Sequence, residues 1–427
     1  MLEYLDLKGV GPAPEMRMEL APRLNLITGD NGLGKSFLLD IGWWALTRTW
    51  AGYPARPRSR ARTEPSISFA FVGKIKRREY RSVFKRREQA WTGKVGRPAN
   101  PGLVLYAQVD GGFAVWDPAR NYWKTASGLD KQDRPPAYVF SASQVWDGLA
   151  EGDAILCNGL IRDWASWQKE NGRPFQLLKA ALEVMSPSAE EPLEPGELTR
   201  ISLDDVRDMP TLKMSFGEET PIVHASAGMR RITALVYLLV WAWEEHQQAT
   251  RLRGERPTRQ VIFLIDELDT HLHPRWQRLV LRSLLEVVGR LMTGGEAEVQ
   301  VVAATHSPLV LASVEPLFDE AKDKLWHLGL VQRKVRLEPV PWTPQGDVVG
   351  WLVSEIFGLR QARSAEAEEA IEAAEAFMRD DRAALPQNLK TKSAIDRRLR
   401  ELLPDHDPFW PRWLVETKQL SGKRSKG

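Results

Sequence analysis

Residues 29–36 combine glycines, a lysine and a hydroxyl side chain at the spacing G-x-x-x-x-G-K-[ST], in the order Gly29-Asp30-Asn31-Gly32-Leu33-Gly34-Lys35-Ser36. Glycines let the backbone curl so that successive N–H groups face a phosphate chain, and the positive end of the following helix adds to the attraction. We expect this loop to bind the phosphates of a nucleotide, with Lys35 on the β- and γ-phosphates and the Ser36 hydroxyl on magnesium. The alternative is a plain Gly-rich turn, but a buried strand before the loop and an apolar helix after it favour the phosphate site.

Two carboxylates follow the apolar run Val261–Ile265, which we predict to be a central strand. Ligands of open α/β sheets bind at the carboxyl ends of the strands. We therefore expect Asp266 to hold magnesium and Glu267 to orient or deprotonate an attacking water as a general base. An acidic pair at a helix start is the alternative, which the following His-Pro would accommodate.

A second apolar run, Val299–Ala304, ends in Thr305-His306-Ser307-Pro308. A histidine at this edge can hydrogen-bond a γ-phosphate and respond to its presence. A lone histidine is more often structural, so His306 becomes a candidate catalytic residue only because it follows the other two motifs.

A third candidate phosphate contact is the segment Ala225-Ser226-Ala227-Gly228-Met229-Arg230-Arg231, which opens a long apolar helix. Small residues at a helix N-terminus form an anion site, and Ser226 and Gly228 would supply it. An ordinary N-cap explains the segment equally well, and only the order of the motifs favours the anion site.

The elements that must position these motifs alternate between strand and helix. Strands are predicted at 24–28, 260–265 and 299–304, and helices at 36–46, 230–247 and 274–291. Such alternation indicates a mainly parallel sheet covered on both faces. We predict a β-meander over 65–122 and an irregular lid, and divide the chain into an N-terminal ATPase lobe (1–124), the lid (125–210), a C-terminal ATPase lobe (211–347) and a helical tail (348–427).

Composition excludes several classes of protein. The 427 residues contain one cysteine, which excludes an internal disulfide and fits a reducing cytoplasm. The N-terminus lacks the pattern of a signal peptide. The longest apolar-rich stretch, Ile232 to Trp243, is shorter than the roughly 20 residues that cross a membrane. We expect a cytoplasmic protein without a membrane partner.

The succession of phosphate loop, S-x-G segment, Asp-Glu strand end and Thr-His-Ser-Pro resembles the ABC ATPases. It is most similar to their DNA-associated branch, namely the structural-maintenance-of-chromosomes, RecF and overcoming-lysogenisation-defect-like ATPases. Residues 266–274 are similar to that branch's D-E-x-E-x-H-L-H-P, with Asp269 in place of the second Glu. The resemblance covers roughly residues 1–50 and 210–345, and its motifs together are highly specific.

The resemblance implies the fold and the assembly. The fold would be an α/β ABC-ATPase head of the P-loop NTPase type, with a mainly parallel core, an antiparallel β-subdomain, a lid and a helical tail. Ser226 and Gly228 would contact the γ-phosphate of ATP held by a second protomer, so that hydrolysis requires a head-to-tail homodimer with ATP and Mg²⁺ between the subunits. His306 would be the switch histidine, and Gln144, after the strand-like 138–140, is our candidate for the glutamine that links magnesium to the lid.

Two histidines after the acidic pair, His271 and His273, could form a metal pair. We prefer a structured turn before the helix at Pro274.

The segment from Arg48 to Arg97 carries fifteen Lys or Arg against three Glu. Interspersed aromatic residues favour a β-surface that binds the backbone of duplex DNA in a salt-dependent way, and a solvated hairpin face is the alternative. The basic residues of this segment include Arg60, Arg62, Lys74 and Lys76.

Two functions remain open. One is the sensor ATPase of an anti-phage defence system that controls a separately encoded nuclease or toxin. The other is a RecF-like clamp or loader in DNA recombination and repair. We prefer the first because the chain lacks long heptad arms. Nuclease activity in this chain is not expected. Asp405-His406-Asp407 lies between prolines and follows no buried strand, and Asp319 and Asp323 are interpreted as part of a surface loop. The aromatic segment 409–413 is either a partner dock or a tail packed on its own protein.

Overall fold

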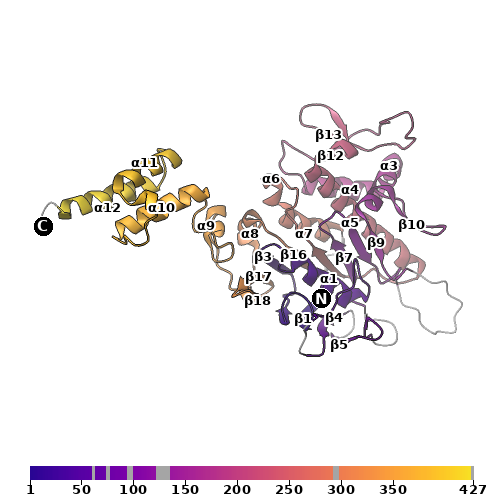
Figure 1. The fold of residues 1–427 in the computed structure, drawn as a ribbon. Helices are drawn as coiled ribbons and strands as arrows, with labels where there is room; N and C mark the ends of the chain where they lie inside the picture. Colours follow the sequence, from indigo (N-terminus) through magenta and orange to yellow (C-terminus); the bar gives the residue numbers. More distant parts are fainter. Residues whose placement is uncertain (60–62, 74–76, 94–99, 122–134, 292–297, 425–427) are drawn as a thin grey trace. The chain divides into compact units, whose positions relative to one another are not determined.

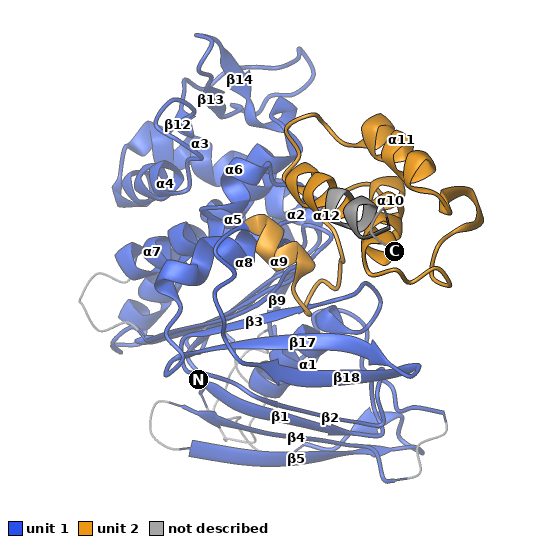
Figure 2. Cartoon of the chain, turned by 90° about the vertical axis from the view of Figure 1, so that its left-hand side faces the viewer, with its two compact units in different colours: residues 1–347 blue, residues 348–427 orange. Residues whose placement is uncertain are grey.

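The computed structural model describes residues 1–427 except 60–62, 74–76, 94–99, 122–134, 292–297 and 425–427. The chain forms two compact units, Met1–Asp347 and Val348–Gly427 (Figure 2). Across the described residues, no helix has the length and apolar character needed to span a membrane.

The first unit is built on an eight-stranded sheet with the order β18-β17-β3-β16-β15-β7-β8-β9. The strands β17, β3, β16, β15 and β7 run parallel, while β18, β8 and β9 pair antiparallel at the two edges. Their bounds are β3 Leu24–Gly29, β7 Leu103–Ala107, β8 Phe113–Trp116, β9 Tyr138–Phe140, β15 Gln260–Ile265, β16 Glu298–Ala304, β17 Asp323–Val331 and β18 Lys334–Val340. The expected mainly parallel core with antiparallel additions is confirmed.

A second sheet of five antiparallel strands, ordered β2-β1-β4-β5-β6, forms the β-subdomain. It consists of β1 Leu2–Lys8, β2 Glu15–Glu19, β4 Ser66–Val72, β5 Arg77–Lys85 and β6 Ala90–Trp91. Helix α1 (Lys35–Thr47) lies between the two sheets, and its apolar side chains join both in one core (Figure 2). The predicted single meander over 65–122 is wrong, because β7 leaves this sheet and enters the parallel core.

Helices cover the other face of the large sheet. Among them are α3 Leu160–Glu170, α4 Arg173–Val184, α5 Ala227–Leu252 and α7 Val280–Leu291 (Figure 1). The segment 125–210 was expected to be irregular, but it contributes α3, α4 and the edge strand β9. The predicted helix 274–291 is interrupted and forms α6 (Pro274–Gln277) and α7. Smaller elements are α2 Ala142–Asp147, β10 Leu149–Glu151, β11 Ala154–Cys157, β12 Glu194–Pro195, β13 Thr211–Lys213, β14 Glu219–Pro221 and α8 Pro308–Val314.

The second unit is helical, as predicted. It consists of α9 Val348–Val353, α10 Ala365–Met378, α11 Lys392–Leu402 and α12 Phe409–Arg424. Trp413 is fully buried and its indole N–H donates to Asp396 Oδ1 at 3.0 Å, while Phe409 is also buried. Two residues of the aromatic segment 409–413, Phe409 and Trp413, therefore belong to the core of their own unit, while Trp410 is only partly buried.

Candidate functional site

Four parallel strands, β3, β16, β15 and β7, end side by side and bring the predicted motifs to one edge of the sheet. Backbone hydrogen bonds continue past the strand ends; they join Asp266 N to Ala107 O (2.9 Å), Leu268 N to Ala304 O (3.0 Å) and Thr305 N to Ile27 O (3.0 Å). The loops that carry the phosphate motif, the acidic pair and His306 are thus held in a fixed order.

The phosphate loop depends on glycine at two crowded positions. Gly29 has φ 137° and a Cβ there would lie 2.1 Å from the Leu328 carbonyl oxygen; at Gly34, φ is 105° and a Cβ would meet Pro12 at 2.7 Å. Asn31 and Gly32 are exposed at the tip of the loop. Only glycine fits the two crowded positions without strain.

Lys35 folds back onto the loop that it follows. Its Nζ donates to the carbonyls of Gly29 (2.8 Å) and Asp30 (2.9 Å). Burial lowers the pKa of this ammonium group, and nearby Glu267 and Asp266 oppose the effect. A phosphate chain in the loop could replace the two carbonyls as the partner of Lys35.

Asp266 fits a magnesium ligand. The residue is 1% exposed, and its Oδ1 has no hydrogen-bond partner. Burial raises the pKa of this carboxyl group, although the Ser36 hydroxyl donates a hydrogen bond to it and acts in the opposite direction. A buried carboxylate oxygen without a partner is costly, and a bound Mg²⁺ between Asp266 and Ser36 would satisfy it.

The donor set also matches the chemistry of magnesium. Among the described residues, no group of three or more His, Cys, Asp or Glu side chains is arranged to hold a metal ion. Magnesium commonly takes one or two protein ligands and completes its shell with phosphate oxygens and waters. Asp266 and Ser36 would be such protein ligands for a metal that arrives with a nucleotide.

Glu267 is held in an uncommon conformation at the end of β15. Its φ is 46°, in the left-handed region that residues other than glycine seldom adopt. The Thr270 hydroxyl donates to Glu267 Oε2 at 2.7 Å, and Thr270 N donates to the Glu267 carbonyl at 3.0 Å. Both the backbone and the carboxylate of the candidate base are thereby oriented.

His306 is linked to the acidic loop through Asp269. The backbone N–H of His306 donates to Asp269 Oδ1 at 3.2 Å, and the Thr305 hydroxyl donates to the same oxygen. Burial and then the charge of Lys35 lower the pKa of the His306 ring, and the nearby Asp269 carboxylate opposes the effect. The aspartate that replaces the expected second glutamate thus fastens the histidine loop to the Glu267 loop.

The S-x-G segment begins α5. Ser226 is the N-cap, and its Oγ accepts a hydrogen bond from Met229 N at 3.3 Å. Gly228 is buried where a Cβ would lie 2.9 Å from the His271 carbonyl oxygen. The ordinary capping role is therefore present, and it leaves the helix N-terminus available to an anion.

The predicted glutamine, Gln144, has a local role. Its Oε1 accepts from Ser141 N at 2.9 Å and completes the capping box of α2, which follows the edge strand β9. Gln108 instead follows β7, the direct neighbour of β15. The sequence pattern did not indicate Gln108, because the buried run Leu103–Ala107 also fits a meander strand.

Three side candidates have structural roles. His273 Nδ1 accepts from Arg275 N and caps α6, as expected for a turn. Asp323 is buried against Arg23, and Asp407 against Arg363.

The basic stretch 48–97 is only partly neutralised where it is described. Arg48 is half-buried, and its guanidinium lies over the rings of Trp44, Phe69 and Tyr80. Burial lowers its pKa to about 10, and Tyr80 acts in the opposite direction. On β5, Arg77 pairs with Glu3 and Glu79, and Arg81 lies 4.0 Å from Glu64. Other basic residues there are exposed, namely Arg78, Lys85, Arg86 and Arg87. Arg60, Arg62, Lys74 and Lys76 lie outside the described residues.

Two curated relatives are similar in sequence. The Septu protein PtuA of Bacillus thuringiensis is 22% identical over 390 residues, which are 87% of this chain and 87% of that protein. The Retron Vc95 probable ATPase of Vibrio cholerae serotype O1 biovar El Tor is 29% identical over 165 residues, 37% of this chain and 28% of that protein.

Solved structures with a related chain course include the SMC head domain from Thermotoga maritima, with 14% identity and a TM-score of 0.40 over 80% of this chain and 99% of that one. The recombination mediator protein RecF-ATPrS has 13% identity and a TM-score of 0.40 over 79% of this chain and 98% of that one.

A family model described as "AAA domain, putative AbiEii toxin, Type IV TA system" matches residues 24–312, from β3 and the phosphate loop to the helix that follows His306. Since this match spans more than half of the chain, the protein belongs to that family of AAA-type ATPase domains.

Proposed function

We propose that the protein binds ATP with Mg²⁺ and hydrolyses it to ADP and phosphate. The observation that carries the proposal is the buried Asp266 Oδ1 without a partner, in contact through its carboxylate with Ser36 and close to Lys35. Membership of the ATPase family supports it.

Each residue of the edge has a role in this reaction. Residues 29–34 and Lys35 bind the phosphate chain, and Ser36 and Asp266 hold Mg²⁺, which supplies positive charge to the β- and γ-phosphates. Glu267, fixed by Thr270, orients a water and accepts its proton as the oxygen attacks the γ-phosphate. The ring of His306 hydrogen-bonds the γ-phosphate. Gln144, or Gln108 at the end of β7 beside β15, would join the metal to a neighbouring loop.

The active form in this proposal is a homodimer. Ser226 and Gly228 at the N-terminus of α5 contact the γ-phosphate bound by a second copy, so each ATP lies between two chains. Ser226→Arg should block ATP-dependent dimerisation and leave nucleotide binding by the monomer intact. An unchanged dimer in sedimentation velocity would remove the S-x-G segment from the proposal.

The biological role that we propose is a cytoplasmic ATPase of anti-phage defence that controls a separately encoded nuclease or toxin. The named Septu and retron relatives support this placement. A RecF-like role on DNA is the second candidate. Arg77 and Arg81 of the basic stretch face carboxylates, whereas its exposed residues Arg78, Lys85, Arg86 and Arg87 are the ones that DNA could contact.

ATP turnover of the full chain, with and without linear duplex DNA at low and high salt, separates the two roles. We expect turnover above that of Glu267→Gln and little response to DNA. A large stimulation by DNA that fades as salt rises would favour the DNA-directed role.

A further inference from the structure

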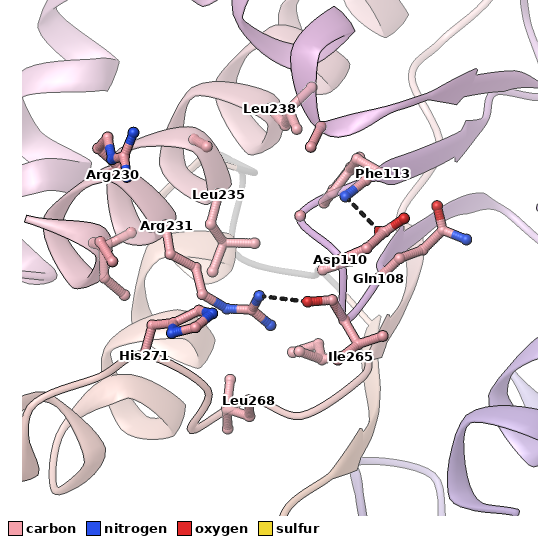
Figure 3. Close-up of a pocket in the computed structure, with 18 of the residues that line it drawn as sticks. Gln108, Asp110, Phe113, Arg230, Arg231, Leu235, Leu238, Ile265, Leu268 and His271 are labelled. Carbon is pink, nitrogen blue, oxygen red and sulfur yellow. Dashed lines mark hydrogen bonds between the residues drawn. The ribbon is translucent and has the colours of Figure 1, made fainter. Parts of the chain in front are cut away.

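Arg231 connects the start of α5 to the end of β15. Its side chain crosses a cavity of about 430 Å³ lined by α5, the loop after β7 and the loop after β15 (Figure 3). Nη1 donates to the Val109 carbonyl at 3.2 Å, and Nη2 donates to the carbonyls of Asp266 (3.1 Å) and Glu267 (3.0 Å). One guanidinium group therefore joins three segments whose ends meet at the proposed site.

The partners of Arg231 are unusual for an arginine beside acidic residues. Burial lowers the pKa of its guanidinium group, and the charges of Glu267, Asp266 and Asp269 oppose that effect. These three hydrogen bonds nevertheless end on backbone carbonyls, so the guanidinium group does not occupy the carboxylates of Asp266 and Glu267. The guanidinium charge of Arg231 therefore holds the backbone of Asp266 and Glu267 in place and does not form an ion pair with their side chains.

The backbone that Arg231 holds is the part of the site under most conformational constraint. Glu267 has φ 46°, and residues in sparsely populated regions keep that conformation only when their surroundings determine it. Thr270 N and Arg231 Nη2 both donate to the Glu267 carbonyl. Arg231 is the one of these two donors that belongs to another element.

We propose that Arg231 is a positioning residue that couples the N-terminal turn of α5 to the placement of Glu267. It follows Ser226 and Gly228 within two turns of the same helix, so a shift of this helix end on anion binding moves the guanidinium and, through it, the Glu267 backbone. The inference rests on the proposed ATPase function. In this inference the start of α5 contacts the ATP of the second copy and also positions Glu267 of its own chain.

The test compares Arg231→Gln, Arg231→Lys and Arg230→Gln in the full chain. Arg230 is the exposed neighbour of Arg231, so Arg230→Gln removes the same charge without touching the three carbonyls. We expect Arg231→Gln to lower kcat by about tenfold or more, with the ATP Kd within about threefold of the unaltered chain. Arg231→Lys should recover part of the loss because an ammonium group can reach some of the carbonyls, and Arg230→Gln should stay within about twofold.

Two further measurements separate coupling from damage to the fold. In the Glu267→Gln background, Arg231→Gln should still form the ATP-dependent dimer, because the dimer forms before Glu267 acts as a base in hydrolysis. Equal kcat for Arg231→Gln and the unaltered chain would overturn the inference, as would a parallel loss of ATP binding in Arg231→Lys. If the unaltered chain does not hydrolyse ATP, the proposed function fails instead, and the two failures are distinct.

Discussion

The carboxyl edge of the eight-stranded sheet and the outer face of the five-stranded sheet both carry charged side chains, but they arrange them in opposite ways. On the five-stranded sheet, exposed arginines meet carboxylates, as Arg77 meets Glu3 and Glu79. At the edge, Asp266 Oδ1 is buried without a partner and Lys35 donates only to carbonyls of its own loop.

The comparison teaches that charge density along the sequence does not locate a site. The segment 48–97 is the most basic part of the sequence, yet some of its described arginines are half-buried or paired, and others are simply exposed. The edge has few charges, but they are desolvated and lack the partners that would neutralise them. Such groups cost stability, and natural proteins keep them where function requires them.

The largest expected difference between the two regions concerns nucleotide affinity. Lys35→Ala should weaken ATP binding by about 100-fold or more, because a charged donor to the phosphates is lost. Arg81→Ala, which removes the same charge from the five-stranded sheet, should change the Kd by less than about twofold. Isothermal titration calorimetry with ATP and Mg²⁺ measures both, and similar losses in the two variants would break the comparison.

The unpaired carboxylate should also be visible in stability. Because burial raises the pKa of Asp266, ionisation of this group opposes folding at neutral pH. Asp266→Asn should therefore raise Tm by about 2–4 °C without metal and abolish any rise in Tm on adding Mg²⁺ with ATP. A lower Tm in Asp266→Asn would mean that the buried carboxylate does not destabilise the folded protein.

Asp40 is a half-buried carboxyl group near Asp266, and its titration allows the edge of the large sheet to be tested through the pH dependence of stability. Burial raises its pKa to about 6 from 3.8, although Tyr106 donates a hydrogen bond to it at 3.0 Å. A carboxyl with a raised native pKa holds its proton more tightly in the folded protein, so its contribution is complete below pH 3.8 and is lost as pH rises toward 6. The loss is roughly 3 kcal/mol at most.

Asp40→Asn should remove this pH dependence while keeping an acceptor for Tyr106. We expect thermal unfolding to show a higher Tm for Asp40→Asn at pH 7.5 and little difference from the unaltered chain near pH 4. Identical pH profiles would show that Asp40 titrates normally.

The smallest effect is expected at the paired surface. Hydrogen bonds from Tyr4 and, to a smaller extent, from Arg77 lower the pKa of Glu79. The Arg77 and Glu79 side chains are nevertheless 52% and 59% exposed. Exposed pairs contribute little, so Glu79→Gln should change Tm by less than about 2 °C. A larger drop in differential scanning calorimetry would show that this face is more than a solvated surface.

The sequence predicted the motif-bearing elements well because each combines a buried apolar run with a sharp change to polar residues. The strand predicted at 260–265 matches β15 (Gln260–Ile265), and the predicted membership of a P-loop ATPase family is confirmed. The run Leu103–Ala107 was misplaced because its pattern fits a meander strand and a core strand equally; only pairing with β15 distinguishes them. Arg231 leaves no signature at all, since backbone carbonyls have no residue type to recognise.

ATP hydrolysis by the full chain and by Glu267→Gln, measured together with ATP-dependent dimerisation, tests the central claim most directly. The account predicts that the unaltered chain turns over ATP only with Mg²⁺, and that Glu267→Gln binds ATP, accumulates as a dimer and loses about 100-fold or more of the rate. Hydrolysis by Glu267→Gln at the normal rate would contradict the assignment of the base and the function built on it.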